Sequence, residues 1–280
     1  MLAGSRNTDT IIGIFRSLCY SRSIMDAILR TTNEQILGVL QGWDSLEALS
    51  VLRFGTDRYD PSFFISYDVY HRGPIPEPGE REQLFTFAVS FESTRDGEKD
   101  RIMVEDIPVR LEYKPVDQVD RLVLAASDGG AAEASVTSTY GFFRLLQATA
   151  ILERGDWLRS TRKTLQYLPD AFWAARIAAY QARMDHVLAD LTSAAYAGEA
   201  LFYQLSLAAF LEALSSLLFA VNREFEPPGR TLQESLLALP VLPEEFETRL
   251  AYLLRSDVAI SDTRRREIAR LITLSALRLS

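Results

Sequence analysis

The alternation of side chains over residues 63–71 constrains the fold of this chain more than any other feature. Large apolar residues occupy every second position there, and successive residues of a strand point to opposite faces of a sheet. One face carries Phe63, Ile65, Tyr67 and Val69, and the other carries Phe64, Ser66, Asp68 and Tyr70. The pattern predicts a strand with a core face and a mixed face, and it places Asp68 in the middle of the mixed face.

Further segments predict partner strands of the same design. Residues 46–54, 84–93, 101–104 and 107–114 are rich in apolar and β-branched side chains, and Val89 and Val109 are expected in the core. The expected polar face then carries three carboxylates and two cations: Asp68, Glu92, Glu112, Arg110 and Lys114. Such a face is either a binding site or the solvent-facing side of an antiparallel sheet.

The rest of the chain predicts a two-domain α+β organisation, since 280 residues are many for one compact core. We expect an α+β domain over residues 1–125 with a leading helix within 9–42, irregular structure over most of 72–82, and a linker at 115–134. An all-helical bundle domain is expected over residues 135–280, with its first helix at 139–154. The apolar run at 200–221 is interpreted as the buried central helix of that bundle rather than a membrane span, because Gln204 and Glu212 interrupt it.

Composition excludes several classes of protein. Residues 1–130 hold 14 basic against 21 acidic residues, whereas nucleic-acid binding needs a basic footprint. The single cysteine, Cys19, rules out an internal disulfide or a cysteine zinc cluster, and two histidines in different domains make a histidine triad improbable. Without a secretory signal pattern the expected location is the cytoplasm. The oligomeric state stays open, a homodimer included.

The turn and the strand that follows it resemble the nucleotidyltransferase superfamily, in the branch with a mixed sheet and a C-terminal helical domain that contains the aminoglycoside nucleotidyltransferases. Gly55 and Thr56 stand for the family's Gly-Ser turn, and Asp68 and Glu112 match its second and third carboxylates. The first carboxylate position is Ser66, which departs from the pattern because hard cations prefer anionic oxygen ligands. The resemblance implies a nucleoside triphosphate substrate, an unknown acceptor hydroxyl, and Mg²⁺ held by Asp68 and Glu112.

Other polar residues are candidates to complete such a site. Glu92 could replace the missing metal ligand. Candidate contacts to nucleotide are Gly55, Thr56, Ser66, Lys99, Arg101, Arg110, Lys163, Asn222 and Arg230. Only three of the 30 basic residues are lysines, and lysine is the residue that supplies a compact ammonium group. For the residues outside the sheet, a solvated hairpin, an exposed helix face and ordinary helix termination are the competing interpretations.

Two functions follow from this interpretation. The first is an Mg²⁺-dependent nucleotidyltransferase in which Asp68 and Glu112 are catalytic. The second is a catalytically inactive relative that binds a nucleotide or a protein partner through the same site, which the serine at position 66 favours.

Overall fold

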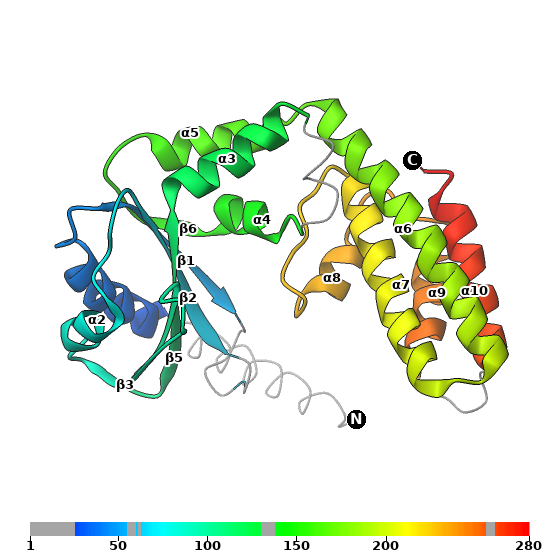
Figure 1. Cartoon of the computed structure of the whole chain (residues 1–280), viewed down its shortest axis with the longest axis horizontal. Coiled ribbons are helices and arrows are strands. Elements are labelled where there is room, and N and C mark those ends of the chain that lie inside the picture. The colour runs from blue at the N-terminus through cyan, green and yellow to red at the C-terminus, as the bar shows by residue number, and fades with distance from the viewer. Residues whose placement is uncertain (1–25, 55–59, 61–62, 130–137, 256–260, 280) are drawn as a thin grey trace, which may run out of the picture. The chain divides into compact units, whose positions relative to one another are not determined.

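The computed structural model describes residues 26–54, 60, 63–129, 138–255 and 261–279, and the chain divides into two compact units (Figure 1). The first unit comprises residues 1–121 and 147–161. The second unit comprises residues 122–146 and 162–280.

The first unit is built on a six-stranded mixed sheet with the strand order β3-β4-β5-β2-β1-β6. The strands are β1 (Leu46–Phe54), β2 (Phe64–His71), β3 (Ala88–Ser93), β4 (Lys99–Val104), β5 (Ile107–Pro115) and β6 (Thr149–Glu153). β2 and β5 pair in parallel, and every other neighbouring pair is antiparallel. The predicted α+β class and the mixed sheet are confirmed.

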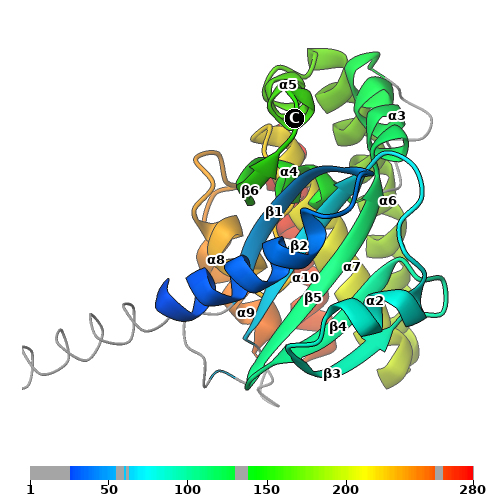
Figure 2. The same cartoon turned by 90° about the vertical axis from the view of Figure 1, so that its left-hand side faces the viewer.

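One face of this sheet is the core. A helix over residues 26–40 and α2 (Pro78–Leu84) lie on that face, as Figure 2 shows. Helix residues Ile36 and Leu40 pack on the inward side chains of β2 and β5, and the predicted core positions Phe63, Ile65 and Val109 are all at most 3% exposed. The register predicted for β2 is therefore confirmed, with Asp68 on the opposite face.

A buried ion pair joins α2 to the core face. The Arg81 guanidinium donates to both carboxylate oxygens of Asp100 at 2.8 and 2.9 Å, and the Tyr113 hydroxyl donates to Asp100 at 2.6 Å. Burial, followed by the charge and hydrogen bond of Asp100, raises the pKa of the Tyr113 phenol. This network anchors the short helix because a buried charge is tolerated only when it is paired and hydrogen-bonded.

The second unit is helical in its described part. It contains α4 (Tyr140–Gln147) up to residue 146, α6 (Asp170–Ala197), α7 (Ala200–Val221), α8 (Leu232–Leu237), α9 (Phe246–Leu254) and α10 (Asp262–Ala276). α6 and α7 form a long hairpin, and Gly198 between them adopts a left-handed φ of 71°. By length and composition α7 could cross a membrane, but 56% of its most apolar 18-residue stretch is buried inside the protein.

Three predictions about local structure are wrong, and one holds only in part. Residues 72–77 are irregular as expected, but α2 begins at Pro78 in the same segment, because proline is compatible with the first helical turn. α3 (Val116–Ser127) replaces most of the expected linker and buries Val116, Val119, Val123 and Ala126 at helical spacing. The helix expected at 139–154 ends at Gln147, since residues 149–153 pair with β1 as strand β6. Val89, expected in the core, is 74% exposed because an irregularity between Ala88 and Ser90 shifts the register of β3.

Candidate functional site

Two of the predicted carboxylates meet on the sheet face opposite the core. Parallel pairing of β2 with β5 sets Asp68 directly beside Glu112, and adjacent strands lie about 4.8 Å apart. Asp68 is 1% exposed and Ser66 is fully buried, so along β2 this face is not the solvent-facing side that was one of the two alternatives. Part of the cover is Trp157 of α5 (Trp157–Gln166), whose ring lies 5.0 Å from that of Tyr70.

A lysine bridges the two carboxylates. Lys114 Nζ lies 2.6 Å from Asp68 Oδ1 and 3.7 Å from Glu112 Oε2. The Tyr70 hydroxyl donates to Asp68 Oδ2 at 3.4 Å. Asp68 is thus held by a cation and a hydroxyl group inside a protein interior, where an unpaired carboxylate would be costly.

The third predicted carboxylate does not join this group. Glu92 lies on β3, three strand spacings or about 14 Å from β2. Across the sheet it pairs in register with Arg101, which pairs with Arg110, which pairs with Ser66. The Glu92 side chain is 74% exposed and lies 3.9 Å from Arg101. The prediction that Glu92 completes a three-carboxylate cluster is therefore wrong. Among the residues that the structure describes, no three His, Cys, Asp or Glu side chains are grouped to hold a metal ion.

The donor set does not fit the magnesium centre that the family resemblance implies. Two-metal phosphoryl transfer requires several carboxylate ligands around ions that clamp the reacting oxygens. Here Lys114 already occupies the space between Asp68 and Glu112, and Ser66 offers only a neutral hydroxyl group. An ammonium group neutralises carboxylates but cannot act as a Lewis acid.

The predicted cations Lys99, Arg101 and Arg110 lie on the same face of the sheet. Arg101 and Arg110 are directly opposite one another, and Lys99 is opposite Glu112. The Arg110 guanidinium lies over the Phe64 ring, 3.9 Å from its centroid. Guanidinium and ammonium groups are suited to binding phosphate, and three of them lie together on this part of the face, where Arg101 also pairs with Glu92 at 3.9 Å.

Ser50 adds an unsatisfied group beside Asp68. It lies on β1 directly opposite Asp68, it is 1% exposed, and its hydroxyl has no hydrogen-bond partner in the structure. Buried hydroxyl groups are usually paired with protein or water. An unpaired hydroxyl next to the Asp68–Lys114 pair is consistent with a site that takes a polar ligand or water.

The remaining predicted residues lie elsewhere. Gly55 and Thr56 are outside the described residues. Lys163, Asn222 and Arg230 belong to the second unit. Lys163 and Arg230 are exposed. The Asn222 amide bonds the backbone of Leu218 and Val241 in three contacts of 2.8 Å, so helix termination accounts for it fully.

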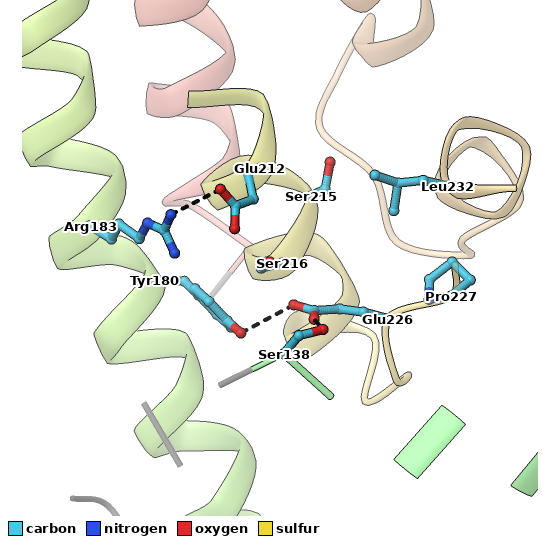
Figure 3. A pocket seen from close by; sticks show the side chains of 9 residues that line it. All are labelled: Ser138, Tyr180, Arg183, Glu212, Ser215, Ser216, Glu226, Pro227 and Leu232. Carbon is cyan, nitrogen blue, oxygen red and sulfur yellow. Dashed lines mark hydrogen bonds and ion pairs between the residues drawn. The ribbon is translucent and has the colours of Figure 1, made fainter. Parts of the chain in front are cut away.

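A second concave site went unpredicted because its residues are far apart in sequence. A cavity of about 160 Å³ in the second unit is lined by Ser138, Tyr180, Arg183, Glu212, Ser215, Ser216, Glu226, Pro227 and Leu232 (Figure 3). The Tyr180 hydroxyl donates to Glu226 at 3.1 Å, and burial together with that carboxylate raises the pKa of Tyr180. Arg183 and Glu212 form an ion pair of 3.0 Å.

Comparison with known proteins gives a partial match. The family described as Domain of unknown function (DUF4037) matches residues 137–229, which include every lining residue of the cavity except Leu232. The crystal structure of a nucleotidyltransferase-like protein from Exiguobacterium sibiricum is similar, with 13% identity and a TM-score of 0.47 over 90% of this chain and 74% of that one. A likeness at that score carries no argument about function. No curated protein matches the sequence.

Proposed function

We propose that the first unit is a nucleotidyltransferase-like module that binds the phosphate groups of a nucleoside triphosphate without Mg²⁺-dependent nucleotidyl transfer. The observation that carries the proposal is Lys114, whose ammonium group sits between Asp68 and Glu112. In the family that the sequence resembles, a metal ion would be held by the carboxylates at these positions.

The chemistry of transfer supports the non-catalytic alternative. A nucleotidyl group moves when ions bound by carboxylates neutralise the phosphates and orient the attacking oxygen. In this unit the positive charge beside Asp68 comes from the protein itself. Ser66 removes one anionic ligand and Glu92 is remote, so the site retains positive charge for phosphate while lacking the ligands for two ions.

Phosphate recognition is supported by Lys99, Arg101 and Arg110. Arginine guanidinium groups bind phosphate through paired hydrogen bonds, and Arg101 and Arg110 face one another on β4 and β5. A triphosphate is preferred over a nucleic acid because the surrounding chain segment is acidic overall.

The test is nucleotide binding with and without metal. Isothermal titration of ATP and GTP in EDTA should show binding that millimolar Mg²⁺ does not strengthen. Arg110→Gln should weaken it about tenfold or more, since a charged hydrogen bond is lost. The matched control is Arg121→Gln, which removes an exposed arginine of the same unit that pairs with Asp117.

The in-register pairing of Asp68 with Glu112 favours one competing function, the Mg²⁺-dependent nucleotidyltransferase. Nucleotide binding that requires Mg²⁺, together with release of pyrophosphate, would establish that function instead. A protein partner becomes the better proposal if no nucleotide binds under either condition.

A further inference from the structure

The cavity in the second unit has the features of a built binding site. α6 contributes Tyr180 and Arg183, α7 contributes Glu212 and the two serines, and Leu232 of α8 closes one side. Figure 3 shows the Arg183–Glu212 pair at one end and Tyr180 with Glu226 at the other. Pockets for drug-sized ligands measure about 300–1,000 Å³, so a cavity of about 160 Å³ is too small for a nucleotide.

The end of the cavity at Glu226 is committed to the fold. Glu226 accepts hydrogen bonds from the Ser138 hydroxyl at 2.5 Å, from the Thr139 backbone N–H at 3.0 Å and from Tyr180 at 3.1 Å. These contacts place a carboxylate at the N-terminus of α4, where a negative charge is favourable. The buried Arg176 donates a hydrogen bond to the Tyr180 hydroxyl.

The outer end is available for exchange. The Arg183 and Glu212 side chains are 40% and 64% exposed, and exposed ion pairs contribute little net stability. A ligand that presents one negative and one positive group could replace the ion pair by pairing with each member. Arg183 would take the carboxylate, for which its planar fork is suited, and Glu212 would take the cation.

The charge balance selects the ligand class. Glu212 and Glu226 are offset by Arg183 and by Arg176, which contacts the Tyr180 hydroxyl, so these four charges sum to zero and give the site no net preference for an anion or a cation. Pro227 and Leu232 supply an apolar wall on one side. We propose that this cavity binds a small zwitterion, an α-amino acid with a short side chain, and this inference does not rest on the nucleotide site.

The first test is a ligand panel on the full chain. L-alanine, L-serine and L-valine should each raise the melting temperature and give a measurable Kd by calorimetry. Their methyl esters lack the carboxylate and their N-acetyl forms lack the ammonium group, so both should bind at least about tenfold more weakly. The proposal is overturned if no amino acid binds at about 10 mM, or if esters and N-acetyl forms bind as well as the parent compounds.

The second test uses matched variants. Arg183→Gln and Glu212→Gln should each weaken binding about tenfold or more while the unit stays folded, because both side chains are substantially exposed. The controls are Arg223→Gln and Asp170→Asn, which remove an exposed ion pair of 2.8 Å that does not line the cavity. Equal losses in the controls, or none in the Arg183 variant, would contradict the assignment.

A third variant tests the cavity itself. Ser216→Leu adds apolar volume to the lining without touching either charge, so it should block the amino acid while leaving the Arg183–Glu212 pair in place. Binding that survives this substitution would place the zwitterion somewhere else on the protein and overturn the proposal.

Discussion

Replacing Lys114 by methionine removes the ammonium group beside Asp68 and keeps an unbranched, flexible side chain of similar width. Asp68 is 1% exposed and the Lys114 side chain is 24% exposed. Breaking a fully buried ion pair by removing one partner costs about 3–5 kcal/mol, whereas an exposed pair contributes about 0–1 kcal/mol. Because the lysine is partly exposed, we expect Lys114→Met to lower the free energy of unfolding of the first unit by about 2–3 kcal/mol.

The assay must report the first unit alone. The protein has three tryptophans, and Trp43 and Trp157 lie in the first unit while Trp173 lies in the second. A Trp173→Phe background therefore makes fluorescence during urea unfolding report the unit that carries Asp68. Lys99→Met is the control, because it removes an exposed lysine from the same face. Its effect should stay within about 0.5 kcal/mol.

A double-mutant cycle separates the ion pair from other losses. Asp68→Asn combined with Lys114→Met removes both charges, so the double variant should be more stable than the sum of the single effects predicts. The expected coupling is about 1–3 kcal/mol for groups in direct contact. Additive effects, or a loss in Lys114→Met no larger than in the control, would show that the ammonium group does not hold Asp68 and would remove the basis for the proposed function.

Three further substitutions and one change of pH test other parts of the structure. Tyr113→Phe should lower the stability of the first unit by about 1–2 kcal/mol in urea unfolding, because it removes a buried 2.6 Å hydrogen bond. Burial raises the pKa of Tyr67 and of Tyr113 above the ordinary value of 10.0, so the folded protein holds these protons more tightly than the unfolded chain does. The stability that results is fully present below pH 10 and is lost as the pH rises further. A circular-dichroism titration should show this loss. Asn222→Ala should destabilise the second unit by about 2 kcal/mol in thermal unfolding while ATP affinity stays unchanged. Ser66→Asp should destabilise the metal-free protein by several kcal/mol, since it adds a charge at a fully buried position, and an equal stability to the parent would contradict the described packing.

The alternation of apolar side chains was sufficient to predict the central strands. Residues 63–71 and 107–114 keep a strict period of two, so the core face and the placement of Asp68 and Glu112 on the opposite face follow from the pattern, whereas the pairing of β2 with β5 that sets them side by side does not. Pro169 with Asp170 marks the start of α6, and the apolar run at 200–221 was correctly interpreted as a buried helix of the bundle, α7. For the strands the signal is the alternation of apolar side chains, and for the helices it is the apolar run or the residue at the helix start; each lies within the segment that it predicts.

The incorrect predictions concern segments whose structure depends on partners distant in the chain. Residues 149–153 form a strand because β1 offers a free edge, and no local signal separates them from the helix before them. The bridge from Lys114 to Asp68 could not be predicted from strand alternation either. Lys114 is paired in register with Tyr70, and its side chain extends along the strand to Asp68, which is paired in register with Glu112.

The sizes of the two candidate sites make the two proposals separable. The cavity of about 160 Å³ in the second unit is too small to enclose a nucleotide, so the proposed nucleotide would bind elsewhere, and the proposal places its phosphates at the facing arginines on β4 and β5. Arg110→Gln and Arg183→Gln each remove one guanidinium from a different unit. If each variant loses only its own ligand, the chain carries two independent sites. If either variant loses both ligands, binding at one site is coupled to the other, and the coupling free energy follows from the ratio of affinities measured with and without the second ligand.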